Sequence, residues 1–488
     1  MRVASLATLA LLSDSALVPQ TGGHVPIARF IEAASSDSRI SARALKEIGT
    51  DWRDAYTALF IDLTRMMRPQ RPPSLPDETM ASPSSPDDAD DRRRLGPSAP
   101  PLDPGSPVRR RLLQFLERQT GQRFGDDLDR WRAWIWSRRD DPHPDYPSFK
   151  RALYGEIDPR MRAFFPDGVK SEIRLDQIDW GGVTVNGIPP LQSPKVVPAS
   201  AAAYLKDANV VFGLFVNGEA RAYPKRILAW HEMALDRVGG VDLTIVYCTL
   251  CGTVIPYESV TAGKRFRFGT SGLLYQSNKL MFDEETNSLW ATFEGKPVVG
   301  SLVGSGIALR TRPVVTTTWK AWRTEHPNTS VLSIDTGHQR DYAEGAAYRD
   351  YFASDRLMFQ VSRTDRRLRN KDEVLVMRLP DGADGRTAIA IDVRFLRAHP
   401  VYSFSVGPSR YVVITSASGA NRVYQLDRAV PEQPQGPNVL DVDGRRWRVT
   451  EDALIPESAE VTPGPRVPAQ RAFWFGWFAQ FPDTKLIK

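Results

Sequence analysis

The only two cysteines of the chain lie close together, in the segment Cys248-Thr249-Leu250-Cys251-Gly252. Thiolates at this spacing can share one metal ion or close a small disulfide ring. The glycine after the pair is typical of a metal-binding turn, because glycine tolerates the positive φ that turns backbone N–H groups toward sulfur. One such pair cannot crosslink a chain of 488 residues, so it indicates a functional site.

A metal ion at this pair would need further ligands, because a structural zinc site has four and the chain has no second cysteine pair. His231 precedes Cys248 in the chain, at the end of a predicted helix over 225–231, and Glu232 follows it. Asp283 lies in a predicted turn, where an Asx-turn would also explain it. We therefore predict a metal site formed by Cys248, Cys251, His231 and Asp283. Sulfur and imidazole ligands suit zinc or copper.

Two other functions are open. The pair could carry out thiol–disulfide exchange, and an oxidising compartment would favour its disulfide form. Redox pairs of the thioredoxin type begin a helix, whereas the β-branched, proline-ended residues after Gly252 argue against a helix here. The chain could also be a non-catalytic interaction module that uses its helical region and the aromatic segment 473–481. The residues reveal neither reaction nor substrate, so whether the protein is an enzyme is open.

The elements that would position this site occur twice. Residues 219–256 align with residues 387–424 at a constant offset of 168, with seven identities and a shared strand–helix–turn–strand pattern. Cys248 aligns with Ser416 and Cys251 with Gly419, so the sulfurs are not needed for the unit to fold. His231 aligns with His399, which leaves a structural role open for this histidine.

Composition divides the rest of the chain. Residues 1–22 resemble a signal peptide, with one arginine before a short apolar stretch. Helical periodicity covers 23–68 and 108–155. Between them, residues 69–107 hold 11 of the 38 prolines and predict a disordered linker. We predict an α+β protein, with this small helical region before a β-rich main domain (156–488) made of two duplicated strand–helix–strand halves.

The charge balance restricts the partners. Lysine and arginine exceed aspartate and glutamate by 64 − 58 = 6, and the two signs are interspersed. We therefore expect no nucleic acid among the partners. No apolar run is long enough to cross a bilayer, so no transmembrane segment is predicted. The partner is an unknown small molecule or protein, and the signal-like start predicts export to the periplasm or outside the cell.

Several segments of the chain resemble the bacterial and archaeal family known as domain of unknown function 3179. The resemblance implies an exported protein without an established activity, and it assigns no catalytic residue. The chain departs from the family at Thr249, where proline is common. The matching segments are Ala222–Pro224, Ile227–Glu232, Tyr247–Gly252, Phe268–Tyr275, Asp283–Trp290, Thr318-Trp319, His326-Pro327, Arg340–Tyr342 and Ala472–Trp477.

Overall fold

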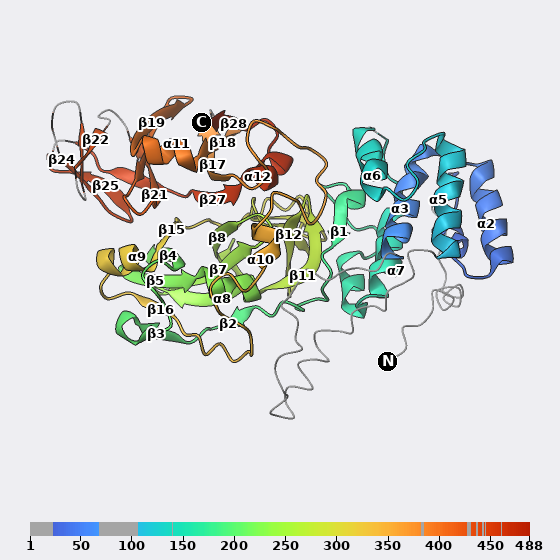
Figure 1. Cartoon of the computed structure of the whole chain (residues 1–488), viewed down its shortest axis with the longest axis horizontal. Coiled ribbons are helices and arrows are strands. Elements are labelled where there is room, and N and C mark those ends of the chain that lie inside the picture. The colour runs from blue at the N-terminus through green and yellow to red at the C-terminus, as the bar shows by residue number, and fades with distance from the viewer. Residues whose placement is uncertain are drawn as a thin grey trace.

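The computed structural model describes residues 23–67, 106–138, 140–381, 385–426, 431–435, 438–441, 444, 446–459 and 461–488. The predicted signal peptide (1–22) and nearly all of the predicted proline-rich linker lie outside these residues. The chain has the predicted α+β architecture, with a small helical N-terminal region and a β-rich main body. Figure 1 shows the helices at one end of the molecule and the sheets at the other.

The N-terminal region consists of amphipathic helices that share a core with the first sheet. Leu112, Leu116 and Trp131 belong to the same buried cluster as Phe282 and Leu289 of that sheet. The apolar stripes of these helices therefore pack on one another, and the core they form continues into the first sheet. The helices are α1 (Ile27–Ala33), α2 (Ser38–Thr50), α3 (Thr57–Met66), α5 (Pro107–Thr120), α6 (Leu128–Ser137) and α7 (Tyr146–Gly155), with 3-10 turns at Asp54–Tyr56, Pro159–Phe164 and Leu175–Gln177.

Five sheets of the main body form a propeller-like ring. Within each sheet, neighbouring strands are hydrogen-bonded in the following order. The first sheet, which the helical region contacts, contains β1 (Ile178–Trp180), β11 (Phe268–Tyr275), β12 (Asn278–Asp283), β13 (Leu289–Ala291) and β14 (Lys296–Val299), and the sheet that carries the cysteine pair contains β2 (Leu191–Gln192), β6 (Met233–Val238), β7 (Val241–Cys248) and β8 (Thr253–Glu258). The other three sheets contain β15 (Val315–Thr318), β4 (Val210–Val216), β5 (Glu219–Pro224), β16 (Ser330–Leu332) and β3 (Val196–Pro198); β27 (Gln470–Phe473), β17 (Glu373–Asp381), β18 (Gly385–Asp392) and β28 (Lys485–Ile487); and β19 (Val401–Val406), β20 (Ser409–Thr415), β21 (Asn421–Leu426), β26 (Gly464–Val467), β25 (Ala453–Pro456), β24 (Arg446–Val449), β23 (Asn438–Asp441) and β22 (Pro431–Gln435). A two-stranded ribbon, β9 (Val260–Thr261) and β10 (Lys264–Arg265), forms a separate sheet that does not belong to these five.

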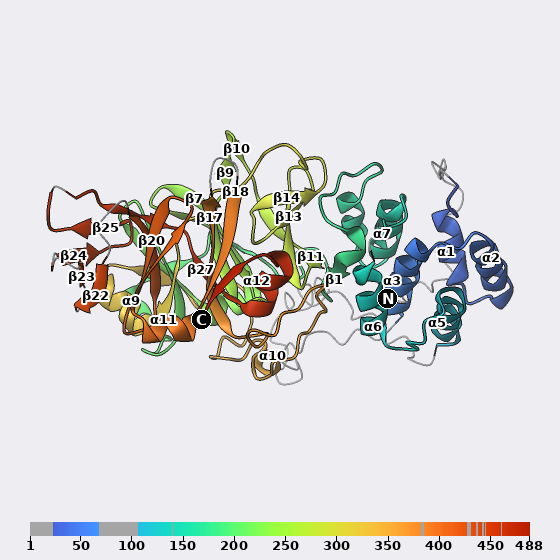
Figure 2. The same cartoon turned by 90° about the horizontal axis from the view of Figure 1, so that it is seen from above.

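Short helices connect the strands of the main body. They are α8 (Lys225–His231), α9 (Trp319–Glu325), α10 (Arg349–Phe352), α11 (Val393–Ala398) and α12 (Trp474–Gln480), with a 3-10 turn at Ala199–Ala201. The helix predicted over 225–231 is confirmed as α8. Figure 2 shows α12, from the C-terminal end of the chain, close to α10.

The two aligned segments have the same elements at the offset found in the sequence. The strands β5/β18, β6/β19 and β8/β21 end at equivalent positions of the alignment, and α8 and α11 begin at equivalent positions. The likeness extends beyond them, because β15–α9–β16 and β27–α12–β28 correspond at an offset of 155. The sheets also match in order, β15-β4-β5-β16 against β27-β17-β18-β28.

The later helices carry a repeated motif that the sequence alignment missed. Trp322 donates its Nε1 hydrogen to Thr329 Oγ1 at 2.9 Å, and Trp477 donates to Thr484 Oγ1 at 2.9 Å. Both motifs read W-x2-W-x4-P-x-T. These two sets of segments therefore share element order, sheet order and one buried hydrogen bond.

Candidate dithiol site

The cysteine pair occupies the hairpin turn between β7 and β8. Cys248 is the last residue of β7, and its register partner is Thr253, the first residue of β8. Gly252 has a φ of +60°, as the sequence predicts, and a Cβ there would lie 2.9 Å from the Phe473 ring. The chain continues as a strand after the pair, which confirms that no helix begins at these thiols.

The two thiols are buried and free, and they interact with each other. Cys248 is 1% exposed and Cys251 is fully buried. Burial raises the pKa of Cys251 well above its usual value, and its hydrogen bond to Cys248 adds to this. Burial opposes the charge of Cys248 too, but hydrogen bonds from Cys251 and from the Lys279 backbone N–H lower its pKa. Cys248 is therefore the thiol that ionises first.

A buried ion pair lies beside the thiols. Lys279, on β12, places Nζ 2.7 Å from Glu232 Oε2 and also donates to the Glu232 backbone carbonyl at 3.0 Å. Thr249, between the cysteines, donates its hydroxyl to Glu232 Oε1 at 3.1 Å, and Tyr348 donates to the same oxygen at 3.3 Å. Glu232 holds a left-handed φ of 55°, which is uncommon outside glycine and costs free energy.

Distant segments of the chain cover the pair. Tyr351 of α10 donates its hydroxyl to the Leu250 carbonyl at 2.7 Å. From the other half of the main body, the Phe473 N–H donates to the Cys251 carbonyl at 2.7 Å. Figure 1 shows α10 in front of the central sheets and α12 near them. Segments far beyond the cysteines in the chain therefore help to build the site.

Gly476 of α12 leaves room for the Cys251 sulfur. A Cβ at this position would lie 3.1 Å from Cys251 Sγ, and such overpacking costs about 1–3 kcal/mol. We expect Gly476→Ala to destabilise the wild-type protein and to cost less in a Cys251→Ala variant, which removes the contact with Sγ but keeps the Cβ of residue 251 at 3.2 Å. Chemical denaturation of the four proteins measures this cycle, and an equal cost in both backgrounds would contradict the contact with the sulfur.

His231 and Asp283 have partners other than the thiols. His231 Nδ1 lies 2.9 Å from the Pro189 carbonyl, and Nε2 lies 2.6 Å from the Tyr342 hydroxyl. Asp283 accepts from the Thr286 N–H at 2.6 Å and the Trp290 Nε1 hydrogen at 2.8 Å, so its carboxylate closes an Asx-type turn. The metal site of Cys248, Cys251, His231 and Asp283 stays a prediction that the structure does not test.

Burial of His231 makes stability depend on pH. Its burial lowers the pKa to about 4, and the nearby His338 and Arg340 act in the same direction. The unfolded chain takes up this proton near pH 6.5, so acidification from pH 7 to pH 4 should lower the free energy of unfolding by up to about 3 kcal/mol through this residue. Denaturation curves at several pH values should show a weaker pH dependence for His231→Gln. An unchanged pH dependence would show that His231 is not protected from protonation.

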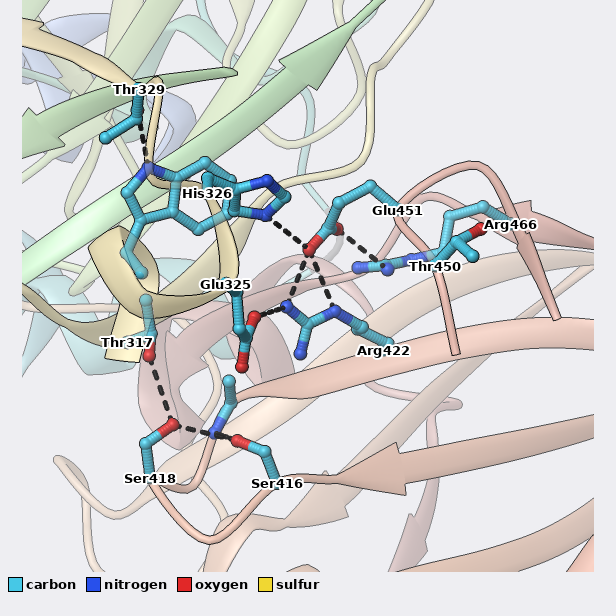
Figure 3. Close-up of polar contacts among 12 residues, drawn as sticks. Thr317, Glu325, His326, Thr329, Ser416, Ser418, Arg422, Thr450, Glu451 and Arg466 are labelled. Atoms are coloured by element: carbon cyan, nitrogen blue, oxygen red, sulfur yellow. Dashed lines mark hydrogen bonds and ion pairs between the residues drawn. The ribbon is translucent and has the colours of Figure 1, made fainter. Parts of the chain in front are cut away.

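In the described part of the chain, one group of three side chains could hold a metal ion, because their potential metal-ligating atoms lie within 4.8 Å of one another. The group consists of Glu325, His326 and Glu451. Figure 3 shows that arginines fill this group. Arg422 Nε donates to Glu451 Oε1 at 2.9 Å, and Arg466 Nη1 lies 3.2 Å from Oε2 of the same carboxylate. The adjacent guanidinium groups, above all Arg422, hold the pKa of Glu451 far below its usual value against the opposing effect of burial. The group is an ion-pair network that joins α9 to the C-terminal sheet.

The fold and site define a class of protein: a β-rich body with a propeller-like ring of sheets that encloses a free dithiol. The chain belongs to the family described as protein of unknown function DUF3179, which matches residues 185–484. All residues of the dithiol site lie within this range. No curated protein and no solved structure matches the chain. Among the described helices, none has the length and apolar character needed to cross a membrane.

Most of the residues around the thiols were not predicted from the sequence. Glu232 was named only as a neighbour of His231, and Lys279, Tyr348, Tyr351 and Gly476 were not identified. A signal for Lys279 was present, because a lysine inside the apolar strand Asn278–Asp283 must find a buried partner. The tyrosines lie far beyond the cysteines in the chain, and no local pattern connects them.

Proposed function

We propose that Cys248 and Cys251 form a thiol–disulfide redox centre. The observation that carries this proposal is the placement of two free, buried thiols three residues apart in one hairpin turn. Dithiol chemistry needs only these two side chains, whereas a three-ligand metal site would need His231 or Asp283 to give up its present partners. Export, predicted from residues 1–22, would favour the oxidised form.

The chemistry proceeds by two exchanges. The Cys248 thiolate attacks one sulfur of a disulfide R–S–S–R, which breaks the S–S bond and releases RS⁻. Cys251 then attacks the Cys248 sulfur, the second RS⁻ leaves, and the Cys251 proton passes to a released thiolate. Overall, the protein dithiol is oxidised to the Cys248–Cys251 disulfide, and the substrate disulfide is reduced to two thiols. The Lys279 ammonium and backbone N–H favour the attacking thiolate.

A redox titration tests this function. The protein is equilibrated in buffers of stepped dithiothreitol ratio, quenched in acid, unfolded and alkylated, and its mass is measured. We expect one two-electron transition in which both thiols disappear together. Cys248→Ser and Cys251→Ser should each keep one alkylatable thiol at every ratio. Two thiols that stay alkylatable in the wild-type protein at all ratios would refute the proposal.

Binding of a soft metal ion is a second candidate function. The positive φ of Gly252 favours it, because this is the conformation of a metal-binding turn. Zinc or copper were the predicted metals, and two thiolates without further ligands suit monovalent copper in particular. Elemental analysis of the purified protein and of Cys248→Ser tests it: a metal present in equal amount to the first and absent from the second would support this function.

We also propose that the main body arose by duplication of one unit, of which only the first copy carries the sulfurs. The matched elements, the matched sheet order and the repeated Trp–Thr hydrogen bond support this. Other members of the family should then carry W-x2-W-x4-P-x-T in both positions. Its absence from one position in most members would contradict a common origin.

A further inference from the structure

A pocket adjoins the buried ion pair of the dithiol site. Glu232, Lys279 and Tyr348 contribute its polar lining, and Leu250, between the two cysteines, reaches it as well. The remaining lining is almost entirely apolar and includes Val183, Ile188, Leu273, Leu274, Met358 and Phe359. The pocket therefore has mostly apolar walls and reaches the groups that contact the thiol turn, while neither sulfur belongs to its lining.

The thiols themselves are closed to large partners. Cys248 and Cys251 are 1% and 0% exposed, and the Tyr351 hydroxyl is bonded to the turn between them. A disulfide on another folded protein could not approach either sulfur without displacing α10 or the C-terminal segment. The oxidant must therefore be small enough to enter through a gap in this cover.

The pocket selects by size and charge. Its cavity volume is about 40 Å³, far below that of pockets for drug-sized ligands, so a large molecule could enter only if the lining moved. Its apolar walls would strip water from a charged ligand without replacing the lost hydrogen bonds. The Glu232 carboxylate already accepts from Lys279, Thr249 and Tyr348, and the ion pair offers no spare cation to an anionic substrate.

From these contacts we infer that the pocket is the route to the dithiol and that its substrates are small, uncharged organic disulfides. This inference rests on the redox function proposed above. It adds the substrate class and the residues that select it. The reaction is the exchange already written, with R an uncharged alkyl group: two S–H groups of the protein are oxidised, and one R–S–S–R is reduced to two R–SH.

The test compares 2-hydroxyethyl disulfide, which is small and uncharged, with glutathione disulfide, which is large and anionic. Each oxidation rate is divided by the rate of the same disulfide with free dithiothreitol. We expect a normalised rate at least tenfold higher for 2-hydroxyethyl disulfide. Equal normalised rates would overturn the inference and leave the redox function standing, whereas oxidation by neither disulfide, even at equilibrium, would overturn both.

Two variants locate the route. Val183 is half-buried in the pocket lining, and Val183→Trp should slow oxidation by 2-hydroxyethyl disulfide about tenfold without changing the redox equilibrium. The matched control is Val260→Trp, at an exposed position on β9, which should react as the wild type does. Leu250→Ala should have the opposite effect, a faster reaction, because it widens the inner end of the pocket. Unchanged rates in both Val183→Trp and Leu250→Ala would place the route elsewhere.

Discussion

Replacing Lys279 with methionine is expected to lower the free energy of unfolding by about 3–5 kcal/mol. The substitution keeps the length of the side chain but removes the ammonium group from a position that is almost fully buried. Glu232 would then keep a carboxylate inside the protein with only hydroxyl partners, and a buried charge without its counter-ion is costly. Urea denaturation at pH 7 measures the effect.

The double variant Glu232→Gln/Lys279→Met is the control for this prediction. It removes both charges, so it should recover a large part of the lost stability. The single variant should also react faster with iodoacetamide under mild denaturant, because its lower stability exposes the buried thiols more often. A Lys279→Met protein as stable as the wild type would show that the ion pair does not hold this part of the core together.

Asp179→Asn is the second substitution with a large expected effect. Asp179 of β1 is 3% exposed and is paired with Arg65 of α3 and Arg132 of α6. The asparagine would leave the buried Arg132 guanidinium without the counter-charge that Asp179 supplies, at a cost of about 3–5 kcal/mol. Because this carboxylate joins two helices to the first sheet, we expect the helical region to become sensitive to proteolysis at denaturant concentrations that leave the wild type intact.

Asp167→Asn is the matched control, because it changes the same residue type in a pair that is mostly exposed. Asp167 Oδ1 lies 3.2 Å from Arg151 Nη1, and the Asp167 side chain is 77% exposed. Water and salt screen such a pair, so no measurable loss of stability is expected. Equal effects of the two substitutions would mean that the helical region does not depend on Asp179 for its attachment.

Local patterns in the sequence predicted local structure well. The helix over 225–231 and the absence of a helix after Gly252 follow from apolar periodicity and β-branched residues, which act within a few positions. The offset between the two aligned segments is also present in the structure, because the same local patterns form the same elements. The cysteine turn was recognisable as a site for the same reason, since both thiols lie within one short turn.

The environment of the thiols and of His231 could not be predicted, because it depends on contacts between residues far apart in the sequence. His231 lies at the end of α8, as predicted, but the direction of its ring depends on Pro189 and Tyr342, which come from distant segments. The cover over the thiols likewise combines Tyr351 with Phe473, which lie far apart in the chain. Such contacts have no local signature, so only the fold could identify the environment of the pair.

The state of the two sulfurs in freshly purified protein decides between the proposed chemistries. Unfolding, alkylation and mass measurement count the thiols, and elemental analysis of the same sample counts metal. The redox account predicts less than one metal ion per ten chains, two alkylatable thiols after dithiothreitol, and none, with a mass lower by about 2 Da, after a small disulfide. One tightly bound metal ion per chain, or two thiols that persist after oxidant, would contradict it.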